Sequence, residues 1–265
     1  MVEFDISNTN LTSLVGVNFP ENVTILKCQY NQLTSLKGCP SSVQTLNCSN
    51  NHLTSLEDCP LSVQTLDCYN NQLTSFEDCP LSVEELYCRN NQLTKLEGCP
   101  PSVKILDCYF NRLSNLEGCS SSVQELCCDL NQLTSLKGCP PSVRMLNCSN
   151  NHLTSLEYCS PFVRELYCYA NQLTSLEDCP PSVQILWSSN NPLNTEYINK
   201  SLEEIHEINK IKAYRNCILK LNSIIFPTVI QRWYRYHYYD KLNSEGISVF
   251  CLRSMEADRK CGILI

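Results

Sequence analysis

A twenty-residue pattern repeats along most of the chain, and it constrains the fold more than any other feature. The segment from Cys39 to Asp58 reads CPSSVQTLNCSNNHLTSLED, and it recurs with small changes as far as Asn191. One unit has the pattern V-x-x-L-x-C-x-x-N-x-L-T-S-L. A fixed period of this length is typical of a solenoid, in which each repeat is one structural unit. We therefore expect a stack of similar turns that share one core.

The spacing within a unit predicts a strand followed by an inward turn. Leu46 and Cys48 are two residues apart, so in a strand both side chains point to one face, and Asn47 points to the other. Stacking the units pairs these strands into one parallel sheet and buries the apolar face. Asn51 follows the strand, and its amide both donates and accepts hydrogen bonds. We expect the stacked Asn column to satisfy buried backbone groups.

The return path of each unit is short and contains a Cys-Pro pair such as Cys39-Pro40. A residue that precedes proline is pushed towards extended conformation, so the pattern predicts an outer side of extended segments and tight turns, without helices. Residues 2–7 fit a first strand, the next unit is two residues longer, and eight regular units follow from Leu33 to Pro192. About ten strands are therefore expected.

This pattern resembles the leucine-rich repeat. The series Leu36, Cys39, Pro40, Ser42, Val43 and Leu46 follows the frame L-P-x-L-P-x-S-L-x-x-L of the 20-residue class found in bacterial effectors. The sequence of the repeats, rich in Cys and Asn, also resembles leucine-rich-repeat proteins of giant viruses of the mimivirus type. The resemblance covers residues 1–193. It implies a solenoid of the α/β-horseshoe class that is mostly β, with an extended convex side, a parallel sheet on the concave face, and a host or viral protein as partner.

Residues 194–265 are predicted to form a helical C-terminal cap or tail. Ser201 and Glu204 have the spacing of a capping box, and apolar residues recur at helical spacing from Leu202 to Leu219. A second helix is expected from Pro227 to about Leu242. Its segment Ile230–Lys241 begins like a calmodulin-binding IQ motif but departs from that motif further on, so we favour packing on the end of the solenoid over a calmodulin-like partner.

The twenty cysteines lie mostly in two columns that repeat every 20 residues, one from Cys28 to Cys168 and one from Cys39 to Cys179. Spacings of 9 and 11 alternate and no C-x-x-C occurs, which argues against a zinc finger. We interpret these cysteines as small buried apolar side chains. A disulfide ladder and a metal-thiolate array remain the alternatives.

The charge of the repeats, the hydropathy of the chain and its first residues limit which partners and locations are expected. Residues 1–195 contain nine Lys or Arg against nineteen Asp or Glu, so the repeats are acidic, which disfavours nucleic acid as a partner. No stretch is apolar enough to span a membrane, and the start MVEFDISNTN does not have the pattern of a secretory signal. The sequence predicts an intracellular protein without a cofactor, located in the host cytoplasm if it is viral.

No catalytic constellation is recognisable, so we predict that the chain is not an enzyme. Bacterial effectors with similar repeats sometimes carry a ubiquitin-ligase domain with a C-x-D motif. Cys127 and Asp129 match that motif, but they fall within a predicted repeat strand.

Binding is expected on the outward side chains of the strands. Two outward columns carry Tyr, Trp and Arg interleaved with acids, and these are residue types that contribute strongly at protein interfaces. The predicted partner-binding residues are Asp67, Tyr69, Tyr87, Arg89, Asp107, Tyr109, Tyr167, Tyr169 and Trp187. The alternative explanation for these residues is random sequence variation at solvent-exposed positions, where Tyr is favoured because it suits strands. The chain is thus predicted to be a protein-interaction scaffold, and the second hypothesis is an adaptor of a ubiquitin-ligase or signalling complex that docks through its C-terminal helices.

Overall fold

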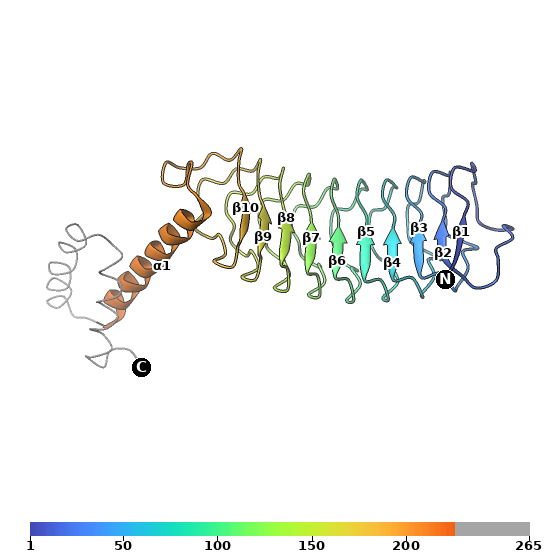
Figure 1. The fold of residues 1–265 in the computed structure, drawn as a ribbon, viewed down its shortest axis with the longest axis horizontal. Helices are drawn as coiled ribbons and strands as arrows, with labels where there is room; N and C mark the ends of the chain where they lie inside the picture. Colours follow the sequence, from blue (N-terminus) through green and yellow to red (C-terminus); the bar gives the residue numbers. More distant parts are fainter. Residues whose placement is uncertain (226–265) are drawn as a thin grey trace. The chain divides into compact units, whose positions relative to one another are not determined.

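The repeats form one parallel sheet in which the strands follow each other in sequence order (Figure 1). The computed structural model describes residues 1–225. Within them, the strands are β1 Val2–Asp5, β2 Val23–Lys27, β3 Thr45–Asn47, β4 Thr65–Asp67, β5 Glu85–Tyr87, β6 Ile105–Asp107, β7 Glu125–Cys127, β8 Met145–Asn147, β9 Glu165–Tyr167 and β10 Ile185–Trp187, and the helix α1 spans Leu202–Ile225. The predicted solenoid and its number of strands are confirmed.

The register of the sheet is that of the sequence repeat. From β2 onwards each residue pairs with the residue twenty positions later, as Leu46 does with Leu66. Only β1 and β2 pair irregularly, with a shift between Val2 and Glu3, because the first unit is longer than the others. Equal spacing keeps identical side chains above one another along the array.

The core consists of columns of fully buried apolar residues. In one unit Val43, Leu46, Cys48 and Leu53 have no exposed surface, and Leu56 has 1%. Burying one such leucine contributes about 2 kcal/mol to stability. The regular strands are only three residues long, but Cys48 continues the pairing by donating its backbone N–H to the oxygen of Asp67 at 2.8 Å. Leu46 and Cys48 therefore face the same interior, as predicted.

The Asn column acts as the sequence predicts. Asn111 donates from Nδ2 to the carbonyl oxygens of Cys88 and Cys108, both at 3.1 Å. Its Oδ1 accepts the backbone N–H of Leu93 at 3.0 Å. One buried amide thus joins its own unit to the preceding one, and the same bonds recur in the other units.

The cysteine column from Cys28 to Cys168 is fully buried inside the array, whereas five of the eight cysteines in the column from Cys39 to Cys179 have intermediate exposure. The thiols of one column donate to the carbonyl oxygen nineteen residues later, as Cys108 does to Cys127 at 3.2 Å. This bond gives six of the eight cysteines in the column a polar partner in the next unit that a leucine in their place would lack. Burial raises the pKa of the Cys48, Cys68 and Cys88 thiols well above the ordinary value. These observations fit the interpretation as buried side chains for the first column and only in part for the second, and the 18 cysteines within residues 1–225 are free thiols.

The outer side of the array is built from tight turns, so the predicted exclusion of helices within the repeats is confirmed. In one unit the backbone N–H groups of Cys59 and Val63 donate to the oxygens of Leu56 and Pro60. In a later unit, Gly138 lies in the turn that precedes Cys139 and has a φ of 87°. A Cβ at this position would lie 2.5 Å from the backbone nitrogen of Glu117. This close approach requires glycine at that position.

A serine column on the outer side forms a further ladder that the sequence analysis missed. The hydroxyl of Ser62 lies 2.7 Å from the oxygen of Ser41 and 2.6 Å from that of Val43. Equivalent contacts recur at Ser82, Ser102, Ser142 and Ser182. A serine in each unit thus satisfies carbonyl groups of the preceding turn.

The chain divides into two compact units, Met1–Ile205 and His206–Ile265. Tyr197 and Ile205 are buried at the end of the first unit, with 2% and 3% of their surface exposed. The predicted capping box is confirmed, since Ser201 Oγ accepts the Glu204 N–H and Glu204 Oε2 accepts the Ser201 N–H. The second predicted helix and the segment Ile230–Lys241 lie outside the described residues. Within residues 1–225 there is no helix whose length and hydropathy would let it cross a membrane.

Candidate functional site

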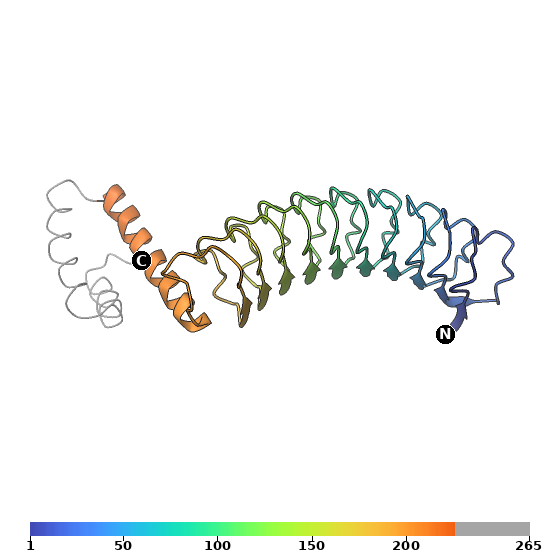
Figure 2. The ribbon, with the colours of Figure 1, turned by 90° about the horizontal axis from the view of Figure 1, so that it is seen from above.

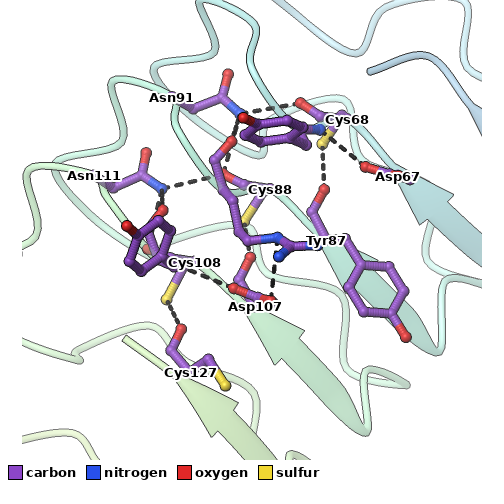
Figure 3. A network of polar contacts seen from close by, with 12 residues as sticks. Asp67, Cys68, Tyr87, Cys88, Asn91, Asp107, Cys108, Asn111 and Cys127 are labelled. Carbon is purple, nitrogen blue, oxygen red and sulfur yellow. Dashed lines mark hydrogen bonds and ion pairs between the residues drawn. The ribbon is translucent and has the colours of Figure 1, made fainter. Parts of the chain in front are cut away.

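The strands of the solenoid lie along the inner edge of a curved array (Figure 2). We call the outward side of these strands, together with the residue that lies two positions after each strand ends, the concave face. Regular pairing places Asp67, Tyr87 and Asp107 side by side on β4, β5 and β6 (Figure 3). The predicted partner-binding residues therefore lie in rows along one surface.

The centre of the concave face is a set of contacts around Arg89. The Nε atom of Arg89 lies 3.3 Å from Oδ2 of Asp107, and its guanidinium lies 5.7 Å from the centre of the Tyr69 ring. Asp67 and Asp107 each accept the backbone N–H of the residue two positions later, Tyr69 at 3.1 Å and Tyr109 at 3.3 Å. An ion pair, a cation–π contact and two local turns thus hold five of the predicted residues together.

The remaining predicted residues form smaller groups. The hydroxyl of Tyr87 donates to Glu85 at 3.3 Å, and that of Tyr167 donates to Glu165 at the same distance. Tyr167 also stacks on Trp187 with ring centres 6.4 Å apart, and Trp187 is 58% exposed. Two of the predicted partner-binding residues, Tyr167 and Trp187, are therefore in direct contact.

The second outward column is partly buried, although binding is expected on the outward side chains. Ser49, Asp129 and Ser149 belong to it and are buried, with 4%, 8% and 0% of their surface exposed. Longer residues such as Tyr69 and Tyr169 stand next to them in the column, and a short side chain between long ones is covered. Asp129 therefore belongs to this surface although the sequence analysis did not select it.

Burial changes the protonation of the concave carboxyls. It raises the pKa of Asp67 and of Asp107, against the opposite effects of Arg89 and of backbone N–H groups. Burial also raises the pKa of Asp129 to about 6, and the negative charge of Asp107 adds to this. For Cys127, burial and the charges of Asp107, Asp129 and Glu125 raise the pKa to about 12. The thiolate is the nucleophilic form, so Cys127 is poorly suited to nucleophilic catalysis at pH 7.

A row of residues at the rim of the concave face was also missed. Tyr30, Phe110 and Leu130 have φ angles of 56°, 53° and 50°, in the left-handed region. Phe110 is 50% exposed and lies 6.1 Å from the Tyr109 ring, centre to centre. The other units mostly have Asn here, as in Asn50-Asn51, and Asn tolerates this conformation. The Asn-Asn pairs were the available signal, and Phe110 and Leu130 stand out as apolar exceptions.

Within residues 1–225 no group of three or more His, Cys, Asp or Glu side chains is placed to hold a metal ion. His52 and His152 are exposed, as their repeat position predicts. The arrangement on the concave face is thus one of aromatic, cationic and acidic side chains held by a rigid sheet.

Solved structures with leucine-rich repeats share this fold. YopM from Yersinia enterocolitica WA-314 is 33% identical over 66% of this chain and 39% of its own, with a TM-score of 0.59. The leucine-rich repeat domain of APL1B is 25% identical over 64% of this chain and 55% of its own, with a TM-score of 0.56. The functional domain of InlJ from Listeria monocytogenes, which includes a cysteine ladder, is 25% identical over 66% of this chain and 45% of its own, with a TM-score of 0.50.

This chain therefore has the leucine-rich-repeat solenoid fold, and it spans about two fifths to just over half of the length of these three proteins. No family model matches the chain, and no curated protein matches it. Among the structures with this fold are bacterial effector proteins. The resemblance to giant-virus proteins stays a prediction from the sequence.

Proposed function

We propose that the chain is a non-enzymatic scaffold that binds a protein partner across its concave face. The observation that carries this proposal is the ordered set of Tyr69, Arg89 and Asp107 at the centre of that face. Arg and Tyr are enriched among the residues that dominate binding energy, and a rigid sheet lowers the entropy cost of presenting them. Solenoid folds of this class commonly mediate protein–protein interaction.

The structure offers a matched pair of variants to test this. Tyr87→Ala with Tyr109→Ala removes two aromatic rings from the concave face. Tyr158→Ala with Phe162→Ala removes two rings from the outer turns, where both side chains are exposed. Affinity capture with the full chain, followed by mass spectrometry and a titration of the captured protein, would compare both variants with the original.

The concave variant should lose the partner, with affinity reduced at least about tenfold, as expected when residues that dominate an interface are truncated. The outer variant should keep the original affinity. Equal binding by the original chain and the concave variant would contradict the proposal. The adaptor hypothesis concerns the two predicted C-terminal helices, of which α1 lies within the described residues and the second does not. It stays a prediction, as does the intracellular location.

A further inference from the structure

The concave face carries more acidic than basic groups. Its acidic side chains within β3 to β10 and the residues that follow them are Asp67, Glu85, Asp107, Glu125, Asp129 and Glu165, against the single cation Arg89. Arg89 is already paired with Asp107. A hollow surface lined by one sign of charge concentrates its field and attracts ligands of the opposite sign. The surplus of carboxylates therefore favours a cationic partner.

Asp129 is the most buried of these carboxylates, and the charge of Arg89 lowers its pKa although the two residues form no ion pair. It is more than nine-tenths buried, and among residues 1–225 its side chain forms no ion pair and no hydrogen bond with another side chain. The backbone N–H of Phe110 donates to the backbone carbonyl oxygen of Asp129 at 3.0 Å, so Tyr109 and Asp129 lie in adjacent turns. A buried carboxylate without a cation is costly for the fold.

A buried polar group without a partner lies in the next turn. The Ser149 hydroxyl oxygen is fully buried and has no hydrogen-bond partner. Leu130 donates its backbone N–H to the backbone carbonyl oxygen of Ser149 at 3.2 Å, which places the turns of residues 129 and 149 next to each other. Buried polar groups in folded proteins are normally hydrogen-bonded. An unsatisfied hydroxyl and a carboxylate without an ion pair thus lie in adjacent turns of the candidate binding surface, which favours a partner that brings a donor to the carboxylate.

Arg89 shows how this surface holds a guanidinium. It packs against the ring of Tyr69 and pairs with Asp107 of the next unit but does not pair with Asp129. Forty residues after Tyr69, Tyr109 provides an equivalent ring, but position 129 carries Asp in place of Arg. The ring thus recurs two units later with an acid in place of the cation, and Asn147 stands at the position equivalent to Asp107.

We infer that the protein partner presents an arginine side chain to this part of the concave face, with its guanidinium against Tyr109 and paired with Asp107 and Asp129. This inference rests on the proposed function and adds the chemistry of the partner. Arginine suits the site better than lysine, because its planar guanidinium stacks on aromatic rings and bridges two carboxylates. The partner would thus be a basic segment of a protein.

The test uses the full-length chain and a library of random 12-residue peptides displayed on phage. Peptides selected on the original chain should be enriched in arginine, and replacing that arginine by lysine should weaken binding about tenfold. Asp129→Asn should weaken the selected peptides at least tenfold. Glu57→Gln, which removes an exposed acid from the outer side, should leave their affinity unchanged. Thermal unfolding of Asp129→Asn at pH 7 should show no loss of stability, which separates weak binding from misfolding.

Each outcome separates the two proposals. Peptides without basic residues that depend on Tyr109 but not on Asp129 would overturn this inference and leave the concave face as the binding surface. Peptides whose binding depends on neither Tyr109 nor Asp129 would count against both the arginine inference and the proposed concave binding surface. Failure to select any peptide would overturn the inference, since an unpaired carboxylate beside an aromatic ring should retain cationic peptides.

Discussion

Leu130 adopts a backbone conformation that its side chain disfavours. Its φ of 50° lies in the left-handed region, where the equivalent residue of the next unit, Asn150, has a φ of 51°. This region costs a branched or bulky residue about 1 kcal/mol, and Asn less, because the Asn side chain bonds locally to the backbone. The conformation is imposed by the stacked turns and not by the residue that occupies it.

Reciprocal substitutions at these two positions should therefore have opposite effects. We expect Leu130→Asn to raise the free energy of unfolding by about 0.5–1 kcal/mol and Asn150→Leu to lower it by a similar amount. Urea unfolding followed by circular dichroism measures both. A loss of stability in Leu130→Asn would show that its half-buried apolar surface outweighs the backbone strain.

Asp129 should destabilise the fold at neutral pH. Its pKa is about 6 in the folded chain and 3.8 ordinarily, so the folded state holds the proton more tightly. Stability from this group is complete below about pH 4 and is lost as the pH rises through about 6. Asp129→Asn lacks this titration and should be about 1 kcal/mol more stable than the original chain at pH 7, a value discounted for the water that still reaches the carboxylate.

Thermal unfolding at pH 4 and pH 7 checks this expectation. The stabilising effect of Asp129→Asn should be large at pH 7 and absent at pH 4. Glu57→Gln, an exposed control, should give no difference at either pH. A variant that is equally stable to the original at pH 7 would show that a cation or water already compensates the carboxylate.

At the scale of the repeat unit, the Asn ladder connects successive turns. Asn151 donates to the oxygens of Cys128, Cys148 and Ser149 and accepts the N–H of Leu133. Asn151→Ala leaves these buried groups unpaired and should cost about 3 kcal/mol. Asn150→Ala changes the neighbouring residue, whose amide makes no such bonds, and should cost less than about 1 kcal/mol.

Urea unfolding of the two alanine variants measures the difference. The comparison controls for chain position, because the two residues are adjacent in one turn. Equal losses would show that water replaces the Asn151 amide, and the ladder would then contribute little to the stability of the array.

The unit was largely predictable from its sequence, and the exceptions have physical reasons. The alternation of side chains along a strand placed Leu46 and Cys48 in the interior. The side-chain amide of Asn51, which both donates and accepts hydrogen bonds, required buried backbone partners. The capping box placed the start of α1 at Leu202. The role of Ser62 was not predictable, because a serine near a turn is equally compatible with exposure to water. The burial of Asp129 also depends on its neighbours in other units, which the pattern of a single unit does not contain.

At the scale of the molecule, the period of 20 residues fixes the register and thus the fold, so the solenoid followed from the sequence. The candidate site followed only in part. Which outward side chains touch depends on their lengths and rotamers, as for Arg89, which reaches Asp107 and the Tyr69 ring in two neighbouring units. The repeat pattern predicts the rows but not these contacts.

Removing one whole unit should preserve the fold. Deletion of residues 132–151 joins Asn131 to His152, so every column stays in step, and we expect cooperative unfolding at a slightly lower midpoint. Deletion of residues 132–150 leaves one extra residue and shifts the following chain against the buried columns. That variant should be destabilised by several kcal/mol, since it leaves buried polar groups unpaired. Circular dichroism and urea unfolding of both variants distinguish these outcomes.

The equal registers of β2 to β10 have a consequence for how the concave face can change. Because every unit presents the same interior to its neighbours, its outward residues can be exchanged while the buried columns and the strand register stay unchanged. Copying, deleting or swapping a unit moves Tyr, Arg and Asp along the surface in steps of one strand. The fold thus separates what the chain displays from what holds it together, so a new recognition surface requires no new core.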